Sequence, residues 1–223
     1  MGSAATPERR AEFDACSLLR HRRGHNRGER PFRAASRCRK GEGALAPALS
    51  AIHFMQMRVM GIDCGGEYTG YGVVEIHSTG KLSCLTCGAI KLSPREPLPR
   101  RLSRIYMHLG AIISEHQPDE VAIEDVFYAL NVKSALKLGQ VRGVAMLAAA
   151  SAGLEVAEYS PLTIKSSVVG YGRAEKQQVQ HMVVRLLELP APPETTDASD
   201  ALAIAICHLH TVATLNRQRA VGR

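Results

Sequence analysis

The order of its apolar segments constrains the fold of this chain more than any other feature. Three strand-like runs follow one another between residues 57 and 92, separated only by a glycine-rich turn after Asp63 and by Ser78-Thr79-Gly80. Such a succession is typical of an antiparallel meander. Two further strand-like runs, at 120–125 and 154–159, alternate with helical patterns. The sequence therefore predicts an α/β fold, a mixed five-stranded sheet flanked by helices.

The helices are predicted from apolar periodicity and from their boundaries. Residues 98–116 carry an apolar stripe at helical spacing, and residues 135–151 are rich in small side chains. Within the second of these, Gly139 and Gly143 lie four residues apart on one face. They would allow a second helix to approach closely, either inside the chain or across a dimer interface. Three more helices are expected at 161–169, 174–189 and 197–215.

The positive charge of the chain is concentrated near its start. Residues 1–56 carry 11 Lys and Arg against 5 Asp and Glu, whereas residues 57–223 carry 17 against 16. The first segment lacks helical or strand periodicity over most of its length, and it has no apolar stretch like that of a secretory signal. We expect residues 1–56 to be a disordered basic extension.

We interpret this extension as translated sequence upstream of a natural start at Met55, Met57 or Met60. A nucleic-acid-binding tail is the alternative. The folded domain is expected to span residues 57–215, followed by a C-terminal tail at 216–223.

The cysteines do not form a disulfide pattern. They lie at positions 16, 38, 64, 84, 87 and 207, and Cys84 and Cys87 make an isolated Cys-x-x-Cys pair within an expected strand. Without a second pair at zinc spacing, a metal or redox role for this pair is not favoured. No apolar run of the sequence approaches the roughly 18 residues of a membrane span. We expect an intracellular, cytoplasmic protein.

Four carboxylates lie where a fold can direct them to one point. Asp63 ends the first strand-like run, Glu124 ends the fourth, and Asp197 and Asp200 are three residues apart at the start of the last helix. Glycines around Asp63 would permit positive φ and close approach of a phosphate. Carboxylates rarely gather inside a fold unless a cation pairs them. A converging set therefore predicts a hard metal such as Mg²⁺ and phosphate chemistry.

Each acid also has a structural interpretation. Asp63 can serve the turn alone, and Glu124 can face solvent at the sheet edge. Asp197 and Asp200 can stabilise the helix dipole, with Thr196 as the N-cap. Alternation along its strand favours an inward-directed Glu124.

The same positions lie in segments that resemble a known family, the RuvC Holliday-junction resolvases of bacteria. The resemblance runs from about Met57 to His210, whereas residues 1–56 have no counterpart. It implies a ribonuclease H-like fold, a homodimer and Mg²⁺-dependent, symmetric cleavage of a four-way DNA junction during recombination and repair. It also implies coordination with the RuvA–RuvB branch-migration complex. The matching segments are 61–63 with 69–73, 122–127, 134–145, Lys165 with 168–170, 174–176 with 179–182, and 197–205.

The resemblance implies a catalytic role for all four acids. Asp63, Glu124, Asp197 and Asp200 would hold two Mg²⁺ ions, for which Mn²⁺ can substitute. One ion would lower the pKa of the attacking water, and the other would stabilise the leaving oxygen.

The resemblance also implies DNA contacts. Phe127 would stack on a base near the junction, and Lys165 and Lys176 would contact phosphates, with Arg142 as a weaker candidate of the same kind. Without the resemblance, a core phenylalanine and ordinary exposed basic residues remain the alternative interpretation.

One residue departs from the family pattern. The family commonly has proline where this chain has Cys64, directly after the catalytic aspartate. A free thiol beside a metal site would be able to bind soft metals or oxidise.

Other functions fit parts of the pattern. Actin-like and sugar-kinase ATPases share the loop Asp-x-Gly-x-x-x-Thr-Gly, but they need a duplicated domain and a second glycine-rich loop. A non-cleaving DNA-binding or scaffold protein, or an RNA-acting nuclease, would have the same fold. The presence of all four acids favours a nuclease.

Overall fold

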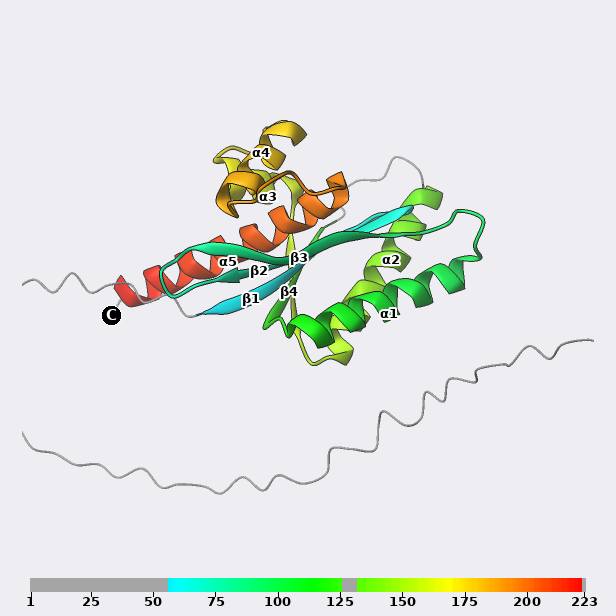
Figure 1. The fold of residues 1–223 in the computed structure, drawn as a ribbon. Coiled ribbons are helices and arrows are strands. Elements are labelled where there is room, and N and C mark those ends of the chain that lie inside the picture. The colour runs from blue at the N-terminus through cyan, green and yellow to red at the C-terminus, as the bar shows by residue number, and fades with distance from the viewer. Residues whose placement is uncertain (1–55, 126–131, 222–223) are drawn as a thin grey trace, which may run out of the picture. The chain divides into compact units, whose positions relative to one another are not determined.

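The computed structural model describes residues 56–125 and 132–221 (Figure 1). The elements follow one another in the predicted order, three strands and then strands that alternate with helices. The strands are β1 (Met57–Cys64), β2 (Tyr68–Ile76), β3 (Leu82–Lys91), β4 (Glu120–Glu124) and β5 (Glu155–Tyr159). The helices are α1 (Leu98–His116), α2 (Val132–Ser151), α3 (Pro161–Val169), α4 (Lys176–Leu186) and α5 (Thr196–Val221).

The predicted mixed sheet is confirmed. Its five strands lie in the order β3-β2-β1-β4-β5. The pairs β1–β2 and β2–β3 are antiparallel, as in a meander, and the pairs β1–β4 and β4–β5 are parallel. Parallel neighbours require a crossover, which α2 supplies between β4 and β5. The carboxyl ends of β1, β4 and β5 consequently meet at one edge of the sheet.

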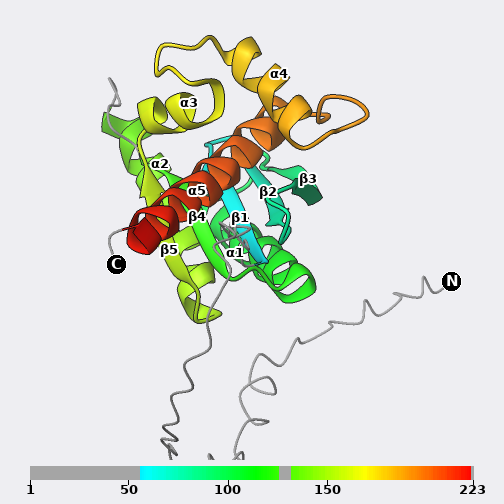
Figure 2. The ribbon, with the colours of Figure 1, turned by 90° about the vertical axis from the view of Figure 1, so that its left-hand side faces the viewer.

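Helices cover both faces of the sheet, as Figure 2 shows. On one face α1 and α2 pack around Met60 and Ile62 of β1, and on the other α3, α4 and α5 pack around Val59. Because successive side chains of a strand point to opposite faces, the odd-numbered residues of β1 face α5. Asp63 is one of them.

Helix α5 lies directly on β1 and β2. A Cβ added at Gly61 would overlap the backbone carbonyl of Ala201, and one added at Gly70 would overlap that of Asp197. By length and composition α5 could cross a membrane, but 61% of its apolar window is buried inside this fold. The helix therefore serves as a central core element, and the glycines set how closely it approaches the sheet.

Some predicted boundaries were wrong. Helix α5 continues past the expected end at Leu215 to Val221, so most of the expected C-terminal tail is helical. Helix α2 begins at Val132 instead of residue 135. Helix α4 begins at Lys176 because Glu175 caps it, its backbone N–H donating to the Gln178 side chain at 2.8 Å.

Candidate metal and nucleic-acid site

Asp63 lies next to the last residue of β1, on the face covered by α5. Its partner across the antiparallel pair is Gly70 of β2. Because Gly70 has no side chain, the first turn of α5 can rest against it, with the backbone carbonyl of Asp197 directly above. The sheet and the helix thus bring Asp63 and Asp197 to the same place.

Glu124 is the last residue of β4, the parallel neighbour of β1. Ile62 pairs with Ile123, so the next residues along the two strands are Asp63 and Glu124. Ala122 belongs to the core on the α5 side, and alternation places Glu124 on the same face. The predicted inward orientation agrees with the pKa of Glu124, which burial and the nearby Asp200 carboxylate raise.

Asp197 and Asp200 lie in the first turns of α5. The backbone N–H of Ala198 donates to the Thr195 hydroxyl at 3.2 Å. Thr195 therefore caps the helix, and the prediction of Thr196 as N-cap was wrong. Asp197 is suitably placed for the helix dipole, while Asp200 is directed into a cavity with Glu124.

The carboxylates repel one another electrostatically. The pKa of Asp63 is raised from 3.8 to about 7, first by burial and then by the charges of Asp200, Glu124 and Asp197, with Lys176 opposing the shift. A divalent cation would remove this repulsion, and carboxylate oxygens are ligands that hard cations prefer. The residues therefore fit a metal of this class. Within the described ranges no group of three or more His, Cys, Asp or Glu side chains is arranged to hold a metal ion. The other three acids are near enough to act on the charge of Asp63, but the four side chains do not form a metal site as they stand.

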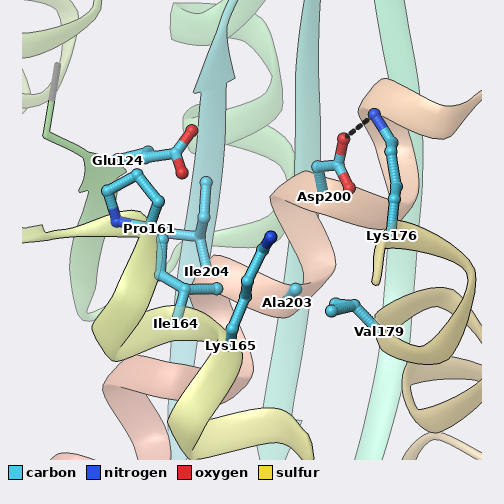
Figure 3. A pocket seen from close by; sticks show the side chains of 9 residues that line it. All are labelled: Glu124, Pro161, Ile164, Lys165, Lys176, Val179, Asp200, Ala203 and Ile204. Atoms are coloured by element: carbon cyan, nitrogen blue, oxygen red, sulfur yellow. Dashed lines mark ion pairs between the residues drawn. The ribbon is translucent and has the colours of Figure 1, made fainter. Parts of the chain in front are cut away.

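A cavity of about 160 Å³ opens between Glu124 and Asp200. Lys165 of α3 and Lys176 of α4 reach its rim, as Figure 3 shows. The ammonium of Lys176 lies 2.6 Å from Oδ2 of Asp200, and the charge of Lys165 lowers the pKa of Glu124. Both predicted phosphate contacts are therefore brought to the carboxylates.

Another predicted DNA contact, Arg142, does not line this cavity. Arg142 of α2 is hydrogen-bonded to Glu158 and lies 3.6 Å from Asp125, and its side chain is only 19% exposed. These partners hold it on the α2 side of the sheet. Phe127 lies outside the described residues.

Cys64 is buried in the core on the α1–α2 side. Burial, followed by the charge of Asp63, raises the pKa of its thiol to about 12. Because the thiolate is the reactive and metal-binding form, this placement argues against a Cys64 that binds soft metals or oxidises readily.

Sequence reasoning missed the main role of the glycines around Asp63. They were expected to adopt positive φ and to admit a phosphate, but among the described glycines only Gly80, Gly153 and Gly170 have positive φ. Gly61 and Gly70 instead admit α5. Their spacing on strands that face an alanine-rich helix was the available signal.

Comparison with known proteins gives consistent matches. The sequence pattern of the family described as "Crossover junction endodeoxyribonuclease RuvC" matches residues 59–208. A protein of that description from Koribacter versatilis (strain Ellin345) is 64% identical over 164 residues, covering 74% of this chain and 99% of the relative. Another from Acidobacterium capsulatum is 55% identical over 170 residues, with the same coverages.

Solved structures agree. Thermus thermophilus RuvC in complex with Holliday junction substrate superposes with a TM-score of 0.68 at 34% identity, covering 71% of this chain and 96% of that one. The yeast mitochondrial Holliday junction resolvase Ydc2 superposes with a TM-score of 0.56 at 15% identity, and the match covers 74% of this chain and 82% of the yeast chain. At this identity the match supports the fold alone.

Proposed function

The chain belongs to the RuvC family of crossover junction endodeoxyribonucleases, and on that premise we propose that it cleaves four-way DNA junctions at the carboxylate site. It is an endonuclease of DNA recombination and repair with a ribonuclease H-like fold. The observation that carries the site assignment is the approach of Glu124, Asp197 and Asp200 to Asp63. Burial first, and then the charges of these three acids, raise the pKa of Asp63 to about 7.

These four acids are proposed as the catalytic metal ligands. The family uses divalent metal, and the all-oxygen donor set favours Mg²⁺, with two ions per site and Mn²⁺ as a substitute. Bound metal would activate the attacking water and stabilise the leaving oxygen. The chain itself contributes the position of the acids, since β1, β4 and α5 hold them on one face.

The lysines at the rim are proposed to position the DNA backbone. Lys165 and Lys176 come from two helices on the same side of the cavity. Phosphate contacts of this kind add salt-dependent affinity and carry little sequence information. Phe127 stays a proposed stacking residue, and Arg142 a proposed phosphate contact that would first have to leave Glu158.

We propose that the working unit is a homodimer assembled through α2. On this helix Val132, Leu136 and Leu147 are 74%, 64% and 57% exposed. Apart from the adjoining residues and backbone of α2 itself, no atom of the described residues lies within 4 Å of a Cβ added at Gly139 or Gly143. This argues against packing of these glycines against another element of the chain. Two active sites related by twofold symmetry would suit paired nicks in a symmetric junction.

The cellular setting follows from family membership. We propose that the enzyme acts in the cytoplasm and is coordinated with the RuvA–RuvB branch-migration complex. An interaction assay with purified RuvA–RuvB on junction DNA would test the second point.

The function is tested with a synthetic four-way junction and Mg²⁺. Paired, symmetric nicks are expected from the native chain and are expected to vanish in Asp63→Asn while junction binding persists. Binding without nicks in the native chain would support a scaffold protein instead, and cleavage of RNA substrates alone would support an RNA nuclease.

A further inference from the structure

The Cys-x-x-Cys pair lies at an irregularity of the edge strand β3. Along the β2–β3 pair, Val73 is opposite Thr86 and Val74 is opposite Cys84, so Leu85 is an extra residue on β3. Such a bulge places two residues of one strand opposite one of the other and changes the alternation of side chains beyond it. The bulge lies inside the Cys84–Cys87 segment.

The bulge brings both thiols to one face. In a regular strand, residues three apart point to opposite faces. Here Cys84 and Cys87 both pack against the core on the α5 side, together with Leu82. Their side chains share a hydrogen bond. The bulge therefore brings the two thiols to the same face, whereas a regular strand with the same sequence would have kept them apart.

The two thiols differ in acidity. Hydrogen bonding from Cys84 lowers the pKa of Cys87 to about 7, even though burial and the charge of Glu194 oppose the shift. The pKa of Cys84 is raised, because this hydrogen bond and its deeper burial favour the protonated form. Among the four cysteines in the described part of the chain, only Cys87 shifts downward, since burial raises the pKa of Cys64 and Cys207. Low pKa together with partial exposure marks a reactive thiol.

We propose that Cys84 and Cys87 form a redox modification site, at which low-molecular-weight disulfides convert the dithiol into an intramolecular disulfide. The Cys87 thiolate attacks the small disulfide RSSR, forms a mixed disulfide and releases RS⁻. The Cys84 sulfur then attacks the Cys87 sulfur, gives up its proton and releases the second half as RSH. The protein loses two electrons and RSSR gains them.

The product would be a covalent link across the bulge of β3. Cys87 is paired with Gly72 of β2, and a Cβ added at Gly72 would press against Leu202 of α5. The disulfide would therefore lie in the part of the sheet that packs against α5, the helix that carries Asp197 and Asp200. The site is separate from those carboxylates and needs no metal.

Peptide mapping tests the proposal on the full chain. The reduced protein is incubated near neutral pH with oxidised glutathione, and the remaining thiols are alkylated. The masses of the tryptic peptides are then measured by mass spectrometry. Cleavage after Lys81 and Lys91 yields a peptide, residues 82–91, with both cysteines. This peptide is expected to become lighter than its reduced form by two hydrogen atoms. A peptide that stays fully alkylated, or that keeps glutathione on Cys87, would overturn the proposal.

Single variants separate the two roles. Cys84→Ala should leave glutathione on Cys87, and the adduct should form about threefold to sixfold more slowly near pH 7, because the loss of thiolate outweighs the gain in nucleophilicity. Cys87→Ala should leave Cys84 unmodified. Cys207→Ala, a change at another thiol of the same core, should not alter the product. An unchanged rate in Cys84→Ala would contradict the assigned hydrogen bond.

Discussion

The ammonium nitrogen of Lys176 lies 2.6 Å from Oδ2 of Asp200, one of the four converging acids. The hydrogen bond to Asp200 raises the pKa of Lys176, and the charges of Asp63 and Asp197 add to the effect. A cation of the protein therefore partly neutralises carboxylates that are proposed to bind metal. We therefore expect a bound metal ion and the Lys176 ammonium to compete for the Asp200 carboxylate, and this competition can be measured.

Replacing Lys176 by methionine should strengthen metal binding in the absence of DNA. The variant keeps an unbranched side chain of similar length but removes the positive charge next to Asp200. We expect Mn²⁺ to bind about threefold to tenfold more tightly, a modest gain because the lysine is partly exposed and screened. Isothermal titration without DNA measures this. Junction cleavage should nevertheless fall, since the proposed phosphate contact is lost.

Lys81→Met is the matched control for this experiment. Lys81 pairs with Glu188 at 2.5 Å, and its side chain is 56% exposed, against 57% for Lys176. Its partner is not one of the four acids, so Mn²⁺ affinity should not change. Equal gains in both variants would show a general charge effect and contradict competition at Asp200.

The raised pKa of Asp63 should make the metal-free protein less stable as pH rises. The folded state holds the proton up to about pH 7, whereas the unfolded chain loses it near the ordinary value of 3.8. Between these values the folded state binds more protons, so this contribution to stability is present below about pH 4 and is lost as pH rises through about 7.

Asp63→Asn should remove this pH dependence. In a chelator at about pH 8, the variant should melt roughly 2–4 °C above the native chain, and the difference should vanish near pH 4. Excess Mg²⁺ should stabilise only the native chain and so reduce or reverse the gap. A variant that melts lower at every pH would show that Asp63 is stabilising and is not held in a repulsive cluster.

The close approach of α5 to the sheet should make Gly70 intolerant of any side chain. Gly70→Ala would push against the backbone carbonyl of Asp197, at a cost of about 1–3 kcal/mol of folding free energy. Cleavage should fall about 10-fold to 100-fold, because Asp197 moves relative to Asp63.

Gly110→Ala serves as the control for this substitution. Gly110 lies within α1, and an added Cβ there meets nothing within 4 Å. Because alanine is the better helix former, the control should gain about 0.5–1 kcal/mol and cleave normally. Denaturant unfolding and junction cleavage are the two measurements. A native cleavage rate in Gly70→Ala would contradict the assigned contact.

Much of the fold could be predicted because the spacing of apolar residues along the chain indicates which side chains are buried. The alternation around Glu124 placed it inward, and the meander followed from three strands joined by turns. Sequence also identified the four acids, because each ends a strand or begins a helix at one edge of the sheet. Their convergence depends on Gly61 and Gly70, whose role appears only once α5 is docked.

Other features depend on contacts that no local pattern reveals. The bulge at Leu85 is set by pairing with β2, so the orientation of Cys87 could not be predicted from the spacing of the cysteines. The predicted reactivity of Cys64 rested on its position next to Asp63 in the sequence. Alternation along β1 instead directs the Cys64 thiol to the opposite face of the sheet from Asp63. The prediction of Arg142 as a DNA contact could not anticipate its ion pair, because the partner Glu158 comes from a different element.

The exposed stripe on α2 should determine the oligomeric state. Leu136 and Leu147 lie three turns apart on one face of the helix, and both are largely exposed. Leu136→Asp together with Leu147→Asp would bury charges without partners at a dimer interface and should yield a monomer in analytical ultracentrifugation. The monomer should lose paired nicking of the junction while its melting temperature stays close to that of the native chain in dilute solution.

Leu215→Asp is the control. It changes a leucine that is 46% exposed on α5, and it should leave the dimer intact. A double variant that still sediments as a dimer would place the interface elsewhere.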